Sequence, residues 1–124
     1  MRKLHQVAVA TACAISAIML SGSVLAAEGG AKKELTGKDL AFDRKKGNCL
    51  ACHAMPTQPD AVSAGLYGPP LIAMSARYPD KAKMRAQIWD ATVANPSSTM
   101  IPFGKHGVLS EKEIDKITDF VYGL

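Results

Sequence analysis

Hydrophobic residues recur at helical spacing near the end of the chain, three or four positions apart. The apolar face that they form consists of Ile114, Ile117, Phe120, Val121 and Leu124. Ser110 and Glu113 precede this face as a capping box, in which each side chain can bond the other residue's backbone N–H. Leu109 can also pack onto Ile114 as a hydrophobic staple. The pattern predicts a last helix that starts at Ser110.

A similar start signal occurs at Thr36. Thr36 can cap a helix, Asp39 falls at its third position, and Leu35 can pack onto Leu40. The pair Gly47-Asn48 is a typical stop. The sequence therefore predicts a first helix that extends from Thr36 to this pair.

Two more helices are expected between these ends. A short one covers residues 71–78, and a longer one begins at Pro79-Asp80 and runs to about Ala94, where Asn95-Pro96 stops it. Proline and glycine interrupt two stretches that we interpret as loops, 54–66 and 95–108. No stretch has the alternation of a β-strand. We expect an all-α domain over residues 36–124.

The N-terminus has the pattern of a secretory signal peptide. Arg2 and Lys3 precede an apolar run, and small residues follow it, so we expect residues 1–26 to be removed. The alternative is a retained membrane anchor, although the run is short for a spanning helix. Residues 27–35 are mostly glycine, alanine and lysine, typical of a flexible tether.

Charge and cysteine content limit the possible functions. The net charge of +4 falls to +2 when Arg2 and Lys3 are removed, which is too little to indicate nucleic-acid binding. Cys13 leaves with the signal peptide, and the apolar segment before it is too short for a lipoprotein signal. Cys49 and Cys52 then remain. Without spare cysteines for cross-links, a domain this small needs another source of stability.

The segment from Cys49 to His53 reads Cys-Leu-Ala-Cys-His, the attachment signature of haem c. The two thiols can form thioethers to the haem vinyl groups, and His53 can bind the iron as proximal ligand. A zinc site would need two more ligands, and only His106 remains. A thioredoxin-like redox pair would require a βαβ context. A chance occurrence in a turn is the third alternative.

The second iron ligand decides the class of haem protein, because a haem with two protein ligands is usually an electron carrier. Met100 is favoured, since it lies in an irregular loop and a proline two residues later stiffens the backbone. Met55 is too close to the haem motif, and Met84 has the spacing of a core residue. His106, Met74 and an open site remain alternatives.

The segment Gly68-Pro69-Pro70-Leu71 is predicted to form a rigid corner. A proximal histidine needs an acceptor for its other ring nitrogen, and a carbonyl in such a corner can supply it. The alternative is an ordinary turn.

With these residues placed, the chain from Thr36 onward resembles a class I cytochrome c. The resemblance implies three to four helices and long loops around one covalently bound haem, with the first and last helices crossing. It implies that the carbonyl of Pro69 holds His53 and that Met100 is the distal ligand.

Within that family the chain looks most similar to SoxX, the monohaem subunit of the SoxAX cytochromes of thiosulfate oxidation. The segments that carry this resemblance are 42–53, 100–104 and 109–122. It implies a periplasmic electron-transfer subunit with no independent activity, paired with a SoxA-type haem subunit and possibly a small third subunit. That complex couples thiosulfate to a cysteine of the carrier SoxYZ and passes electrons to another cytochrome. The alternatives are a free periplasmic electron shuttle and a haem enzyme or sensor with an open sixth site.

Overall fold

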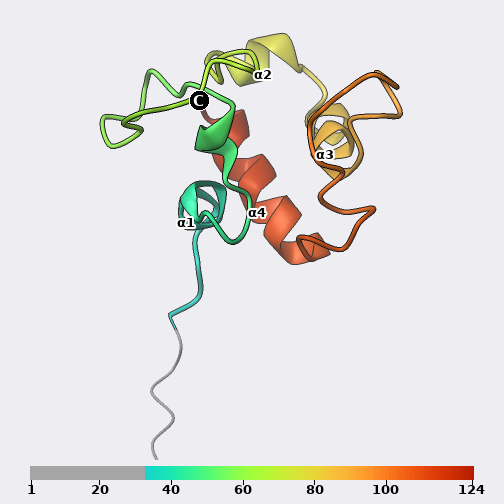
Figure 1. Cartoon of the computed structure of the whole chain (residues 1–124), viewed down its shortest axis with the longest axis horizontal. Helices are drawn as coiled ribbons and strands as arrows, with labels where there is room; N and C mark the ends of the chain where they lie inside the picture. The colour runs from blue at the N-terminus through green and yellow to red at the C-terminus, as the bar shows by residue number, and fades with distance from the viewer. Residues whose placement is uncertain (1–32) are drawn as a thin grey trace, which may run out of the picture. The chain divides into compact units, whose positions relative to one another are not determined.

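The computed structural model describes residues 33–124, which contain four α-helices, one 3-10 helix and no β-strand. The helices are α1 (Gly37–Phe42), α2 (Met74–Arg77), α3 (Lys81–Trp89) and α4 (Glu111–Tyr122), and the 3-10 helix η1 covers Cys49–Ala51 (Figure 1). The predicted all-α architecture is confirmed. The predicted signal peptide over 1–26 lies outside the described residues, as does most of the predicted tether over 27–35.

The last helix, α4, is the element that the other helices contact. It packs against α1, α2 and α3, and Figure 1 shows it running between α1 and α3. At the contact with α1, a Cβ on Gly37 would lie 2.0 Å from the carbonyl oxygen of Lys116. Only glycine therefore allows the two backbones to approach this closely. Phe42 and Phe120 pack edge to face beside this point, with ring centroids 6.2 Å apart.

Both predicted capping boxes are present, and they fix where α1 and α4 begin. The hydroxyl of Thr36 accepts a hydrogen bond from the N–H of Asp39, whose carboxylate accepts from the N–H of Thr36. Ser110 and Glu113 make the same reciprocal pair in front of α4. These contacts involve residues three positions apart, and short-range pairs of this kind can be read from sequence.

Two helices end earlier than predicted, and in both cases an aspartate ends them. The first was expected to reach Gly47-Asn48, but α1 ends at Phe42, where Asp43 turns extended and its carboxylate accepts the N–H of Lys45. The third was expected to reach Ala94, but α3 ends at Trp89, where Asp90 accepts from the N–H and hydroxyl of Thr92. Such side-chain bonds offer the backbone an alternative to the helix.

The second helix is also shorter than the predicted 71–78 segment. It begins only at Met74, because Ala73 has a left-handed backbone (φ 51°). Short helices leave long connecting loops, and these loops carry the residues of the candidate site.

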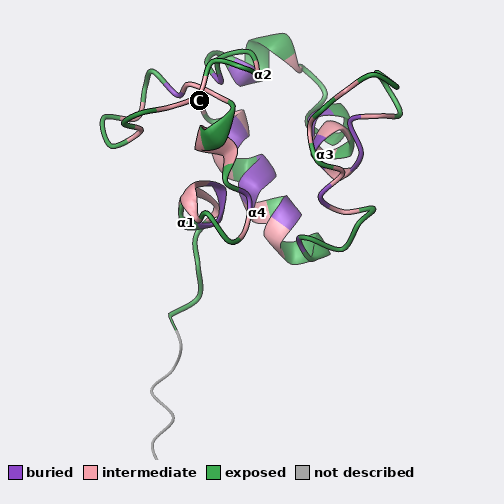
Figure 2. Ribbon diagram, in the orientation of Figure 1, coloured by how far each residue is buried: buried purple, intermediate pink, exposed green. Residues whose placement is uncertain are grey.

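The buried core lies between α4, the faces of α1 and α3, and several loop residues (Figure 2). Its members are Leu40, Ala41, Met55, Leu71, Met74, Met84, Ile88, Phe103, Leu109, Ile114, Ile117 and Val121. Three of the five residues in the predicted apolar face of the last helix, Ile114, Ile117 and Val121, are therefore buried, and Leu109 is buried with Ile114 as the staple predicts.

The helix contact at Gly37 generates a stability prediction. Gly37→Ala should destabilise the protein by about 1–3 kcal/mol, because the new methyl group must push α1 away from α4. Gly123→Ala is the matched control, since its Cβ would have no neighbour nearer than 3.5 Å. Thermal unfolding of both variants measures the difference. Equal Tm values for the two variants would contradict the close approach.

The cap of α4 generates a prediction about pH. The ammonium of Lys46, 2.8 Å away, and the N–H of Ser110 lower the pKa of Glu113 from its ordinary 4.5 to about 2. The charged carboxylate therefore stabilises the fold above pH 4.5, and this contribution disappears as the pH falls toward 2. Glu113→Gln should lose about 1 kcal/mol at pH 7 and be less sensitive to acid between pH 4.5 and 2. Denaturant unfolding at pH 7 and pH 3 tests this, and an unchanged pH dependence would argue against it.

Candidate haem site

The segment Cys49 to His53 forms a tight turn that brings its two thiols and the imidazole to one place. Cys49 begins η1 after a left-handed Asn48, and its carbonyl accepts the N–H groups of both Cys52 and His53. Cys49 is partly buried and Cys52 is exposed. Burial raises the pKa of the Cys49 thiol to about 11, so this thiol is protonated at neutral pH in the chain as described.

The ring of His53 is fixed on one side by the proline corner. Its Nδ1 lies 2.7 Å from the carbonyl oxygen of Pro69, which can only accept, so Nδ1 donates the hydrogen bond. A Cβ on Gly68 would lie 2.4 Å from the ring, so the backbone of the corner presses directly on it. In the neutral ring, the proton on Nδ1 leaves the lone pair of Nε2 available to a metal ion.

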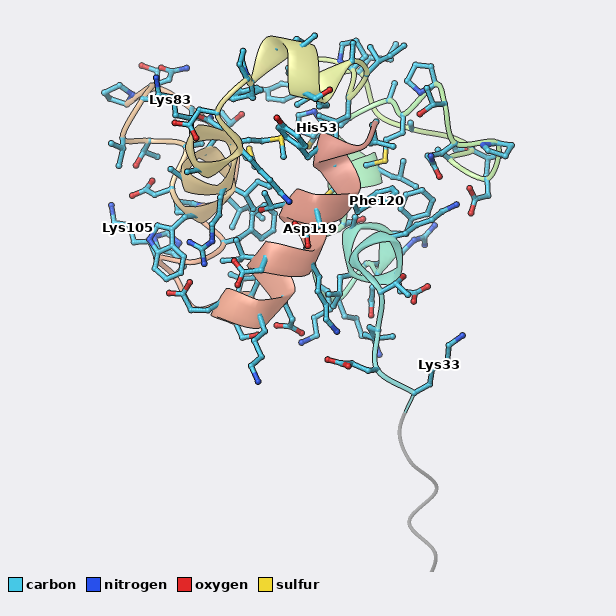
Figure 3. All side chains as sticks on the ribbon, turned by 180° about the vertical axis from the view of Figure 1, so that it is seen from behind. Lys33, His53, Lys83, Lys105, Asp119 and Phe120 are labelled. Atoms are coloured by element: carbon cyan, nitrogen blue, oxygen red, sulfur yellow. The ribbon has the colours of Figure 1, made fainter. Side chains whose placement is uncertain are left out.

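A cavity of about 600 Å³ opens beside His53. In the view of Figure 3, His53 lies between α3 and α4. The cavity is lined by both motif cysteines, His53 and Pro69 and by a continuous stretch of the loop that contains Met100. Its other apolar lining includes Leu71, Met74, Met84, Ile88, Ile101, Phe103, Leu109, Ile117 and Val121.

This lining fits a haem. Two thiols, an imidazole with a free lone pair and methionine thioethers border one largely apolar space, and together they can supply the attachment points and the iron ligands of a covalently bound haem. Among residues 33–124, no group of three His, Cys, Asp or Glu side chains is placed to hold a metal ion.

The candidate distal ligands occupy different environments. Met55 is 2% exposed and does not line the cavity, and His106 is exposed on the surface away from it. Met74 and Met84 line the cavity as buried core residues, and Nη1 of Arg77 lies 3.4 Å from the sulfur of Met74. Met100 lines the cavity from a loop and is partly buried. The structure thus brings Met100, but not His106, to the same cavity as His53.

The loop that contains Met100 is anchored to the end of α3. Asp90 is only 5% exposed, and its carboxylate binds the ammonium of Lys105 at 2.8 Å. This ammonium and the Thr92 hydroxyl lower the pKa of Asp90 to about 2. The N–H groups of Gly104 and Lys105 both bond the carbonyl of Trp89, and a Cβ on Gly104 would collide with the Trp89 ring. The backbone is therefore fixed within five residues of Met100.

Several residues of this arrangement were not predicted from the sequence. Asp90, Gly104 and Arg77 support the loop or the proline corner through contacts with residues from other parts of the chain or across a turn. Only Asp90 has a local signal, because an aspartate two residues before a threonine often forms a side-chain turn.

The fold has a relative among solved structures. The crystal structure of SoxXA from P. pantotrophus matches the chain with a TM-score of 0.63 at 23% sequence identity, over 69% of this chain and 77% of that chain. The chain has an all-α class I cytochrome c fold, as its motifs predict. No helix within residues 33–124 is both long and apolar enough to cross a bilayer.

The sequence is similar to a known protein over part of its length. No protein-family model matches the chain. A protein of Aquifex aeolicus named "Uncharacterized lipoprotein" is 35% identical over 78 residues, which is 63% of this chain and 37% of that protein. The chain thus spans little more than a third of that relative's length. Cys13, the residue weighed above for lipid attachment, lies outside the described residues.

The size of the cavity generates a prediction about folding. Without a haem, the apolar side chains around this cavity of about 600 Å³ would face water, and a domain this small has little other core to offset that loss. If haem fills this cavity, the double variant Cys49→Ser, Cys52→Ser should be largely unfolded or degraded after export. Far-UV circular dichroism and the yield of purified protein measure this. A double variant with native helix content and no haem would contradict the hypothesis.

Proposed function

We propose that the chain holds one haem c and carries electrons. Cys49 and Cys52 would form the thioethers, and His53 and Met100 would bind the iron. The observation that supports this most is that both cysteines, Met100 and a His53 whose Nδ1 donates to Pro69 line one cavity. When bound, the haem supplies an iron that exchanges one electron between its ferrous and ferric states.

The residues of the chain have separate tasks in this role. The Pro69 carbonyl keeps the proton on Nδ1 of His53 and so directs Nε2 toward the metal. The thioether of Met100 is a soft ligand that favours the ferrous state and raises the potential. The apolar lining restricts water at the iron, so little rearrangement is needed when the electron arrives.

We further propose that this electron carrier is the SoxX-type subunit of a periplasmic thiosulfate-oxidising complex, exported after removal of residues 1–26. The fold likeness to SoxXA and the sequence resemblance over 42–53, 100–104 and 109–122 support this assignment. With Cys49 and Cys52 used by the haem and Cys13 removed, the mature chain has no thiol to hold a sulfur intermediate. A SoxA-type partner would therefore perform the chemistry on the SoxYZ carrier.

The redox balance of the proposed reaction defines what this chain would contribute. Joining thiosulfate to a cysteine thiol of the carrier forms one S–S bond and releases one proton and two electrons. This chain, holding one haem, would take these electrons one at a time from its partner and pass each to a downstream cytochrome. A free electron shuttle would have the same site but would need no SoxA-type partner.

The test follows reduction of this haem by thiosulfate and carrier, with and without a SoxA-type partner. The isolated chain should show no reduction, and addition of the partner should produce it. Met100→Ala, which opens the iron to added ligands and lowers its potential, should be reduced to a smaller extent. The matched control His106→Ala should behave as wild type, because His106 lies on the surface away from the cavity.

Two results would overturn parts of this proposal. Thiosulfate turnover by the isolated chain would contradict the role of a subunit without its own activity. A partner that binds without reducing the haem would indicate a free electron shuttle instead.

A further inference from the structure

Arg77, the last residue of α2, is the only lysine, arginine, aspartate or glutamate among the described residues that line the cavity. Its Nη1 donates a hydrogen bond of 2.7 Å to the carbonyl oxygen of Pro70 and lies 3.4 Å from the sulfur of Met74. Pro70 directly follows Pro69, whose carbonyl accepts from His53. The guanidinium is therefore one peptide unit away from the acceptor of the proximal histidine.

The prolines explain why this contact matters. Neither Pro69 nor Pro70 has a backbone N–H, so neither can fix the corner by donating a hydrogen bond. The N–H of Gly68 bonds the carbonyl of Cys52 on one side, and the N–H of Leu71 bonds that of Ala54 on the other, both at 2.8 Å.

The peptide unit between Pro70 and Leu71 is consequently held at both of its polar ends. Its N–H is held by Ala54, and its carbonyl is held by the charged side chain of Arg77. Hydrogen bonds from a charged donor are stronger than neutral ones. Without Arg77, this unit would keep only one of its two contacts, and the adjoining Pro69 carbonyl would be free to tilt away from His53.

We propose that Arg77 is a positioning residue for His53, which fixes the Pro69 carbonyl through Pro70 and so sets the strength of the hydrogen bond from Nδ1. The same guanidinium holds the sulfur of Met74, a thioether that also lines the cavity. This proposal rests on the proposed function, because it assumes that His53 binds a haem iron.

The direct readout is solvent exchange of the His53 Nδ1 proton, measured by NMR on the ferrous, ¹⁵N-histidine-labelled holoprotein. Arg77→Met should accelerate this exchange about tenfold, as expected when a charge-assisted hydrogen bond no longer fixes the acceptor. Arg77→Lys keeps the charge but lacks the planar fork, so its exchange should be intermediate. Arg44→Met is the matched control: Arg44 is exposed near the haem motif, and no described residue forms a hydrogen bond or ion pair with it.

The midpoint potential separates positioning from charge. A weaker hydrogen bond makes His53 a poorer donor to ferric iron, so Arg77→Lys should have a higher potential than wild type. An Arg77→Lys variant that matches wild type in both exchange and potential would show that Arg77 acts only as a charge, and the proposal would be wrong.

The proposal is equally wrong if Arg44→Met accelerates exchange as much as Arg77→Met. Should Arg77→Met fail to fold, the exchange rate in Arg77→Lys decides alone. A wild-type protein without covalent haem would instead refute the proposed function.

Discussion

The hydrogen bond from His53 to Pro69 is the constraint on which the candidate site depends. It joins residues 16 positions apart and fixes the imidazole independently of any metal. Gly68 lies directly against the ring, and a larger residue at this position would collide with it. Backbone hydrogen bonds from Gly68 and Leu71 then fix the ends of the corner. A loop with little regular structure thus becomes a rigid support for one side chain.

The loop that contains Met100 is fixed by different contacts. There the chain leaves α3 at Asp90 and returns to it at Gly104 and Lys105, which bond the last turn of the helix. The loop between these points contains Met100. Helices that end early at aspartates are therefore useful to the fold, because each releases backbone that lines or supports the cavity. The helices supply the apolar floor, and the loops supply the candidate ligands.

The parts of the fold that were predicted from sequence are those governed by short-range contacts. The capping boxes at Thr36 and Ser110 and the buried face of α4 depend on residues three or four positions apart. The predicted ends of α1 and α3 were wrong. Glycine and proline were taken as the stops, whereas aspartate side chains end both helices earlier in the sequence.

Other features could not be read from the sequence, because they depend on residues distant along the chain. Nothing local to Gly37 indicates the backbone of Lys116 above it, and nothing local to Arg77 indicates its contact with the corner that supports His53. The sequence predicted His53 and Met100 as candidate iron ligands from separate signals. That they line one cavity while His106 does not is a result of the tertiary structure.

The most direct test of the account is to identify the methionine that lies over the haem. In a diamagnetic ferrous haem protein, the ring current of the macrocycle strongly shifts the methyl resonance of an axial methionine. The NMR spectrum of the methyl-labelled methionines should contain one such resonance, and Met100→Leu should remove it. If the shifted methyl belongs to Met74 or Met84, or if no methionine methyl is shifted, the proposed pairing of His53 with Met100 is wrong.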